Sequence, residues 1–143
     1  MPLQRLEHFL VLTDDLAATS DFYCRILGLY VGPRPPLGFD GEWLYLGSVP
    51  CVHTAEWESY RRHSLAAGIA VSQRAPGTGP VDHLAFVADD PDGMRARLQG
   101  HGLKFAENSV PGARLTQFFM VDPNGVKVEI NAQTGVEPGP TPN

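Results

Sequence analysis

The chain has few cysteines, no cluster of basic residues and no long apolar run. Its 143 residues include two cysteines, Cys24 and Cys51, without CxxC spacing, so we expect free thiols in a reducing compartment. Lys and Arg form no run and the net charge is −5, which argues against nucleic acid and anionic membranes as partners. No apolar stretch approaches the ~20 residues that cross a bilayer, and we see no secretion signal, so we expect a cytoplasmic protein.

A short segment occurs twice in the chain, each time with a histidine. "LEHFLVLTDD" (residues 6–15) and "VDHLAFVADD" (residues 81–90) share an acidic residue, a histidine, an apolar run and then Asp-Asp. Aligning His8 with His83 also aligns Glu7 with Asp82. Because internal similarity at a fixed distance indicates duplicated structural units, we read the chain as two related halves.

Each half contains the same series of predicted elements. The repeated segment is a short strand, and an amphipathic helix follows it, over residues 15–27 in the first half. In the second half Asp90-Pro91 begins the helix as cap and first helical residue, and the glycines near residue 100 end it. Three strands follow each helix: residues 29–32, 43–47 and 51–56 in the first half, and 104–107, 115–121 and 126–131 in the second.

The predicted fold is α+β, with two tandem βαβββ modules forming a curved mixed sheet that cups a metal site. The predicted modules span residues 1–56 and 81–132. Residues 57–80 are a linker, of which the early part is either helical or mobile and the end, "APGTGP", is a loop. Residues 133–143, rich in proline and glycine, form a flexible tail.

The metal site follows from aligning the last strands of the two halves. "PCVHTA" superimposes on "VKVEIN", which places His53 opposite Glu129. The first strands offer His8 and His83, and a pseudo-twofold relation between the halves would bring all four side chains together. Three imidazoles and one carboxylate around a point are a donor set for a divalent transition metal.

The turn "DPNG" (residues 122–125) predicts which residues surround this site. A three-residue loop with Gly125 in the left-handed region pairs Asp122 with Val126. Counting outward, Phe119 lies opposite Glu129, and Gln117 is the next residue on the same face. The repeat places Trp43 and Tyr45 on the corresponding wall of the first half. We therefore predict a substrate pocket lined by these four residues: Trp43, Tyr45, Gln117 and Phe119.

The sequence resembles the vicinal oxygen chelate superfamily, the group of glyoxalase I, bleomycin-resistance proteins and extradiol dioxygenases. Three stretches carry the resemblance, which extends over residues 4–132: "LEHFLVLTDDLAATSDFYCRILGL", "VDHLAFVADD" and "DPNGVKVEI". The resemblance implies paired βαβββ units whose sheets surround a metal, with ligands from the first and last strands of each unit.

The resemblance also assigns the candidate ligands by position. His8, His83 and Glu129 match the usual ligand places, whereas His53 stands where glyoxalase I has a glutamate. His53 is therefore either a fourth ligand or a neighbour of the ligands that contacts substrate. Phe119 stands where extradiol dioxygenases have a tyrosine, which weakens a close likeness to those enzymes.

The implied activity is metal-dependent. Four protein ligands on an octahedral ion leave two adjacent positions for two neighbouring oxygens of a small substrate, and aromatic substrates such as catechols are included. The divalent ion, which is Fe, Mn, Ni, Co or Zn, would then stabilise charge that develops on those oxygens. We expect either a glyoxalase-like lyase or isomerase, with Glu129 as a possible catalytic base, or a ring-cleaving extradiol-type dioxygenase. The alternative is a metal-free, bleomycin-resistance-like protein that binds a small molecule.

Two further expectations concern partners and substrate charge. Half-cups in this superfamily often close across a twofold axis, so we expect a homodimer, with the metal site formed within one chain or between two. Four arginines are candidates for binding an anionic substrate, although solvation at the surface is the more common role of such residues. They are Arg34, Arg61, Arg62 and Arg74.

Overall fold

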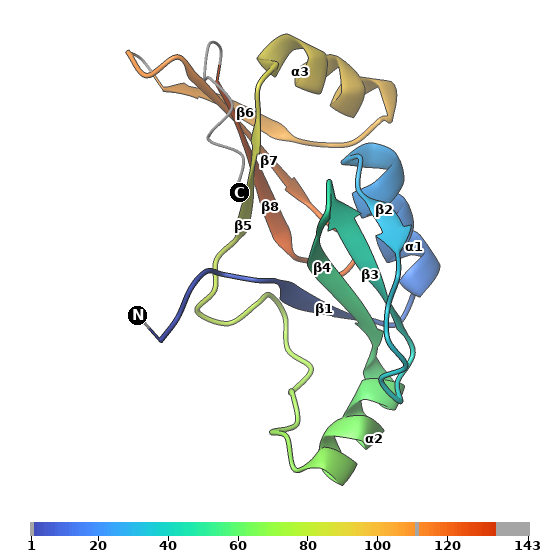
Figure 1. Cartoon of the computed structure of the whole chain (residues 1–143). Coiled ribbons are helices and arrows are strands. Elements are labelled where there is room, and N and C mark those ends of the chain that lie inside the picture. Colours follow the sequence, from blue (N-terminus) through green and yellow to red (C-terminus); the bar gives the residue numbers. More distant parts are fainter. Residues whose placement is uncertain (1, 111, 134–143) are drawn as a thin grey trace. The chain divides into compact units, whose positions relative to one another are not determined.

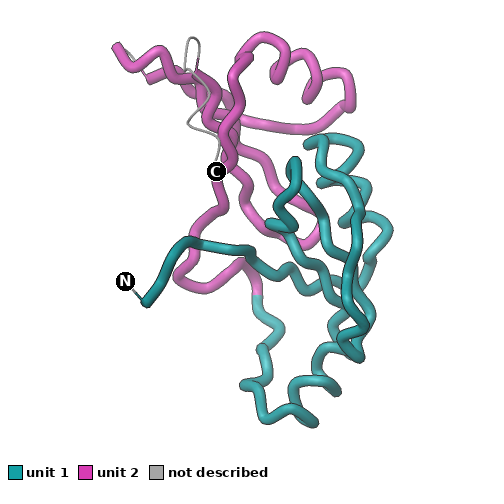
Figure 2. Tube along the Cα trace, in the orientation of Figure 1, with its two compact units in different colours: residues 1–75 teal, residues 76–143 magenta. Residues whose placement is uncertain are grey.

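The structure is a computed structural model, and it describes residues 2–110 and 112–133. The chain divides into two compact units, residues 1–75 and residues 76–143 (Figure 2). Of the segment predicted as a flexible tail, Gln133 ends the last strand, and residues 134–143 lie outside the described residues.

The first unit has the order strand, helix, three strands, and a further helix (Figure 1). Its elements are β1 Phe9–Thr13, α1 Leu16–Asp21, the π-helical segment η1 Phe22–Ile26, β2 Tyr30–Gly32, β3 Gly41–Leu46, β4 Val49–Glu56 and α2 Trp57–Ala67. The predicted first helix is thus α-helical only in its first part and continues as η1. The start of the predicted linker is a regular helix, which ends at Gly68 in the left-handed conformation.

The sheet of this unit is mixed, with the order β1-β4-β3-β2. β1 and β4 are parallel and pair Leu10 with His53, while β3 and β4 are antiparallel and pair Trp43 with His53. Directly paired residues project on the same face of a sheet, and neighbours along a strand project on opposite faces. One face therefore carries His53 and Trp43, and we call it the site face of the first unit.

The opposite face is the hydrophobic core of this unit. Val11, Leu44 and Val52 on the strands are almost inaccessible, as are Phe22 and Tyr23 on η1. The helix begins at Asp15, whose side chain accepts a hydrogen bond from the backbone N–H of Ala18. This cap satisfies one of the backbone donors that a helix start leaves without a partner.

The second unit repeats the arrangement. Its elements are β5 Leu84–Ala88, α3 Pro91–Gly100, β6 Ala106–Val110, β7 Leu115–Val121 and β8 Lys127–Gln133, with the sheet order β5-β8-β7-β6. The helix begins at Asp90 and has proline at its start, as predicted. Its core contains Leu98 from α3 together with Phe118, Val128 and Ile130 from the sheet.

The hairpin between β7 and β8 confirms the register expected from "DPNG". The backbone N–H of Asp122 donates to the carbonyl of Val126 at 2.9 Å, and Gly125 has φ 88°. Phe119 consequently pairs with Glu129, and both project on the site face of the second unit. The α+β class and the tandem βαβββ modules are confirmed, with one four-stranded sheet in each unit.

Candidate metal and substrate site

In the first unit, three rings stack on the site face. His8, immediately before β1, stacks on His53 with ring centroids 3.7 Å apart and planes 13° apart. The indole of Trp43 covers the other side of His53, with centroids 4.4 Å apart and planes 11° apart. Trp43, predicted as pocket wall, thus contacts a predicted ligand directly. The stack follows from the register that pairs Trp43 with His53.

His53 is buried, with 7 % of its surface exposed. Burial lowers the pKa of its imidazole below the ordinary 6.5, and the charge of His8 lowers it further, while a hydrogen bond to the backbone of Pro50 opposes this. Its Nε2 atom is buried and has no hydrogen-bond partner among the described residues. A neutral imidazole with an unpartnered nitrogen is a suitable metal donor, because metals bind the deprotonated ring.

In the second unit, a histidine and a carboxylate form the corresponding pair. Nε2 of His83, immediately before β5, lies 3.0 Å from Oε2 of Glu129 on β8. Glu129 is buried, with 6 % of its surface exposed. The pKa of His83 is raised, first by its hydrogen bond to Asp82 and then, against partial desolvation, by the charge of Glu129. The contact is therefore an ion pair whenever His83 is protonated.

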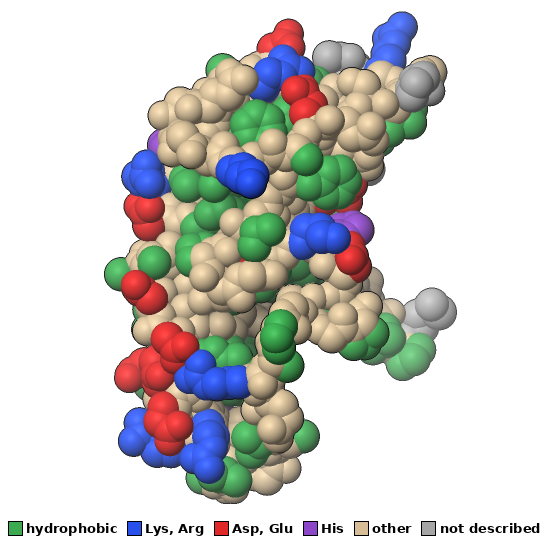
Figure 3. All heavy atoms as spheres, turned by 180° about the vertical axis from the view of Figure 1, so that it is seen from behind, with side chains coloured by type: hydrophobic (Ala, Val, Ile, Leu, Met, Phe, Trp, Pro, Cys, Tyr) green, Lys and Arg blue, Asp and Glu red, His purple; other side chains and the backbone are tan. Residues whose placement is uncertain are grey.

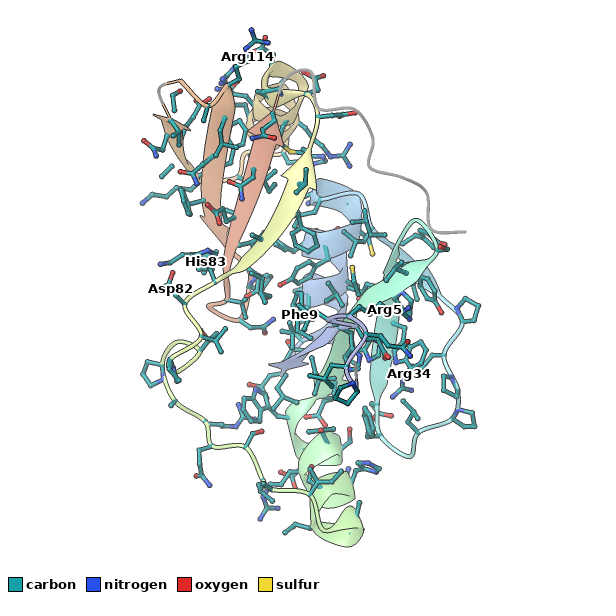
Figure 4. All side chains as sticks on the ribbon, turned by 60° about the vertical axis from the view of Figure 1, so that its left-hand side comes forward. Arg5, Phe9, Arg34, Asp82, His83 and Arg114 are labelled. Atoms are coloured by element: carbon teal, nitrogen blue, oxygen red, sulfur yellow. The ribbon has the colours of Figure 1, made fainter. Side chains whose placement is uncertain are left out.

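His8 and His83 are each preceded by an acidic residue that contacts the imidazole ring. Nδ1 of His8 lies 3.0 Å from Oε1 of Glu7. Nδ1 of His83 lies 2.6 Å from Oδ2 of Asp82, and Figure 4 labels these last two residues. A carboxylate on one ring nitrogen orients the imidazole and leaves the other nitrogen for a metal. The repeated acidic residue was visible in the alignment, but the role of Glu7 and Asp82 became clear only from these contacts.

Amide side chains hold the carboxylate of Glu129. Nε2 of Gln117 donates to Oε1 of Glu129 at 2.8 Å and to Oδ1 of Asn131 at 3.3 Å. Nδ2 of Asn108 in turn donates to Oε1 of Gln117 at 3.0 Å. Asn108, Gln117 and Asn131 are register partners on β6, β7 and β8, and we call them the amide row. Asn108 and Asn131 were not predicted as site residues.

The remaining predicted wall residues have different environments. Phe119 meets the ring of His83 edge to face, with centroids 6.4 Å apart. Tyr45 stacks on Tyr30 at 5.4 Å, and its hydroxyl donates to the carbonyl of Pro33 at 2.5 Å. Phe119 therefore contacts a predicted ligand, whereas the hydroxyl of Tyr45 is hydrogen-bonded to the backbone.

Each unit taken by itself supplies two donors of the kinds that divalent transition metals bind. The first unit brings together His8 and His53, and the second brings together His83 and Glu129. Within residues 2–110 and 112–133, no three His, Cys, Asp or Glu side chains are grouped so that they could hold an ion. The four-ligand site thus stays a prediction, and its two halves are the pairs described here.

Elsewhere on the surface that the structure describes, charged side chains of both signs are interspersed (Figure 3). On the face in Figure 3, Lys and Arg side chains are scattered, and several adjoin acidic ones. The ion pairs agree with this distribution, because Arg25, Arg95 and Lys127 each pair with carboxylates. No helix among the described residues is long and apolar enough to cross a membrane.

The chain belongs to the Glyoxalase/Bleomycin resistance protein/Dioxygenase superfamily, whose family model matches residues 5–130. This match includes both histidine segments, β4, the turn between β7 and β8 and the start of β8 as far as Ile130, and it confirms the resemblance drawn from the sequence. No curated protein sequence matched the chain.

Solved structures with the same fold have diverse named roles. A lactoylglutathione lyase from Agrobacterium tumefaciens is 19% identical, with TM-score 0.64 over 92% of this chain and 96% of that one. A fosfomycin resistance protein from Listeria monocytogenes is 16% identical, with TM-score 0.66 over 93% and 96%. An antibiotic-binding protein from a Streptomyces species is 18% identical, with TM-score 0.64 over 93% and 98%. At these identities the likeness establishes the fold alone.

Proposed function

We propose that the protein is a metal-dependent enzyme that binds two neighbouring oxygens of a small substrate at a divalent ion. The observation that supports this most is the equivalent pair of donors in each unit. His8 and His53 stack at 3.7 Å, and His83 and Glu129 lie 3.0 Å apart, at corresponding positions of the duplicated fold. Membership of the superfamily supports the proposal, because its metal-dependent members take their ligands from the first and last strands of each unit.

The proposed ligands are His8, His53, His83 and Glu129. When bound, the ion would supply Lewis acidity toward the substrate oxygens. The chain supplies the rest: Glu7 and Asp82 orient their histidines, and Gln117 fixes Glu129. A proton and the ion cannot both occupy Nε2 of His83, so His83 would have to lose its proton for the ion to bind. Metal binding should therefore release protons.

The reaction class is a glyoxalase-like isomerisation or lyase reaction, or an extradiol-type ring cleavage. In the first case a proton leaves a carbon next to a carbonyl, and Glu129 is the carboxylate of the set that can accept it. In the second case oxygen is consumed. Oxygen uptake with catechols, compared with a methylglyoxal–thiol assay, separates the two reactions.

Metal analysis is the first test of the proposal. Protein purified without chelator should contain about one transition ion per site. After the ion is removed by chelation and dialysis, the protein should bind it again when it is added back. His83→Ala should lower metal affinity by more than about a hundredfold, because even loss of a residue that only orients a ligand costs about 10- to 100-fold. His101→Ala is the matched control, because His101 lies at the end of α3.

The second candidate is a metal-free protein that binds a small aromatic molecule. The stack of His8, His53 and Trp43 favours it, because such rings also bind flat ligands. If the purified chain contains no ion and does not bind Fe(II), Mn(II), Ni(II), Co(II) or Zn(II) in titrations, this second function replaces the first.

We further propose a homodimer, with the predicted site formed within one chain or between two. Mass measurement in solution tests the dimer. Mixing His8→Ala with His83→Ala protein tests sharing, because only a site between chains regains metal binding in mixed dimers. A monomer that binds metal stoichiometrically would rule out the shared site.

A further inference from the structure

Arg34 differs from the other three arginines that the sequence offered as anion-binding candidates. Arg61 pairs with Glu58 at 3.4 Å, and Arg74 pairs with Asp14 at 2.7 Å. Arg62 is exposed on α2. Arg34 is half-buried, and it has no acidic partner among the residues that the structure describes.

The guanidinium of Arg34 is nevertheless held in place. Its Nη2 donates to the carbonyl of Phe39 at 2.8 Å, and its Cζ lies 4.9 Å from the centroid of the Phe39 ring. That ring packs in turn against Tyr60 at 5.0 Å and His63 at 4.8 Å. Phe39 therefore fixes the cation from two directions.

One donor of this cation is left without a partner. Nε of Arg34 is buried and makes no hydrogen bond within the described part of the chain. Withdrawing a charged donor from water is unfavourable unless an acceptor or an opposite charge replaces the water. Because Nε has no acceptor and the guanidinium has no acidic partner among the described residues, its surroundings are suited to an anion that comes from outside the chain.

Arg34 lies beside the candidate site. The register of the first sheet pairs Gly32 with Trp43 and Trp43 with His53, and Arg34 is two residues beyond Gly32. The positive charge of Arg34 also contributes to the lowered pKa of His53. Figure 4 labels Arg34 within the first unit.

The next row of the sheet offers Arg34 no polar side chain as a partner. β3 and β4 pair Gly41 with Ala55 in that row, so one position has no side chain and the other has only a methyl group. In the second unit the corresponding residues of β7 and β8 are Gln117 and Asn131, which fill the row with amides.

We propose that Arg34 binds an oxyanion group of the substrate, a carboxylate or a phosphate, next to the pair His8–His53. The substrate is then an anion that carries both two neighbouring oxygens for the metal and a separate acidic group for Arg34. This inference rests on the proposed function, because it places the acidic group relative to the metal-bound oxygens.

Binding of two probes to the Zn(II)-loaded protein without oxygen tests the substrate class. Catechol offers two neighbouring oxygens, and protocatechuate offers the same oxygens and a carboxylate. We expect protocatechuate to bind more tightly by about tenfold to a hundredfold, as charge-assisted hydrogen bonds provide. Arg34→Gln should remove this preference and leave the affinity of the Zn(II)-loaded protein for catechol unchanged. Arg62→Gln, which removes an exposed charge, should retain it.

A second measurement uses metal-free protein and a probe that does not have to bind a metal. In the full metal-free chain, the Nε–Hε signal of Arg34 is identified by its loss in Arg34→Lys, and inorganic phosphate is titrated. We expect a saturable shift of this signal and none for Arg62. Absence of a shift, or equal shifts for both arginines, overturns the anion site.

The outcomes separate the two proposals. If Zn(II) binds and catechol binds, but protocatechuate shows no Arg34-dependent preference and phosphate causes no shift, the inference fails and the proposed function stands. If no metal binds, the proposed function fails. A phosphate shift at Arg34 would then support an anion site that works without a metal.

Discussion

The two units share a fold but carry different chemistry on their site faces. The first unit has an aromatic face, in which His8 and Trp43 enclose the buried ring of His53. The second has a hydrogen-bonded face, in which Gln117 and His83 contact the buried carboxylate of Glu129. The same register positions therefore hold an imidazole nitrogen donor in one unit and a carboxyl oxygen donor in the other.

Sterics at Gly41 help to explain the difference. A Cβ atom at Gly41 would lie 2.0 Å from the backbone oxygen of Thr54, so the first unit cannot accept a side chain there without a shift of the backbone. Gln117 occupies the equivalent position in the second unit and forms the centre of the amide row. The two units thus share a scaffold, but the backbone of the first unit at Gly41 leaves no space for the amide side chain that the second unit carries at Gln117.

The largest effect is expected where the two units are alike, in their cores. Leu44 pairs with Val52, and Met120 pairs with Val128, at equivalent positions of the two sheets. Both side chains are buried, so Leu44→Ala and Met120→Ala should each lower the free energy of unfolding by about 2–5 kcal/mol. Urea titration measures both, and a cost below about 1 kcal/mol in one unit would show that the cores are not equivalent.

Gly41→Ala should destabilise the first unit, because the added methyl group overlaps the backbone of Thr54. We expect a loss of about 1–3 kcal/mol in thermal or urea unfolding. Gly47→Ala is not a suitable control, because Gly47 has positive φ. Gly100→Ala is suitable, since a Cβ there meets no atom within 4 Å and φ lies outside the left-handed range.

Gln117→Leu should weaken metal binding without removing a ligand. The substitution leaves Oε1 of Glu129 without its 2.8 Å donor, and loss of such an orienting bond lowers metal affinity by about 10- to 100-fold. Calorimetric titration with Zn(II) measures the change. An affinity equal to that of the parent protein would mean that the amide row has no part in positioning the carboxylate.

The smallest effect is a difference in pH response between two histidines. In metal-free protein, burial lowers the pKa of His53, and the bond to Asp82 raises the pKa of His83, from a common ordinary value of 6.5. Between the two values His83 is protonated and His53 is neutral. Imidazole NMR signals followed against pH should therefore titrate in the order His53 and then His83 as pH rises.

The same shifts have opposite consequences for stability. His53 binds its proton less readily in the folded protein than in the unfolded chain. Its contribution to the free energy of unfolding is therefore present above pH ~6.5 and is lost as pH falls through its folded pKa. His83 binds its proton more readily when folded, so its contribution is present below pH ~6.5 and is lost as pH rises through its folded pKa. His83→Gln should remove the second effect only, and an unchanged pH profile of that variant would contradict the assignment.

Much of the fold could be predicted from local patterns. Asp90-Pro91 marked the start of α3, and the turn at residues 122–125 set the pairing of Phe119 with Glu129. The conversion of the first helix into η1 was not predicted, because a short amphipathic segment does not specify a hydrogen-bond register. For the early part of residues 57–80 the sequence left a helix and a mobile segment as alternatives, and the structure has the helix α2. His8 and His83 lie just before their strands rather than within them.

The sequence alone determined the duplication, the βαβββ order and the pairing of four candidate donors by position. It could do so because strand alternation and turn geometry are local properties of the chain. Only the tertiary structure decided that Trp43 covers His53, that Glu7 and Asp82 orient their histidines, and that Arg34 has no acidic partner in the described chain. Such contacts depend on the packing and desolvation of side chains from several strands and loops, which residue spacing does not specify.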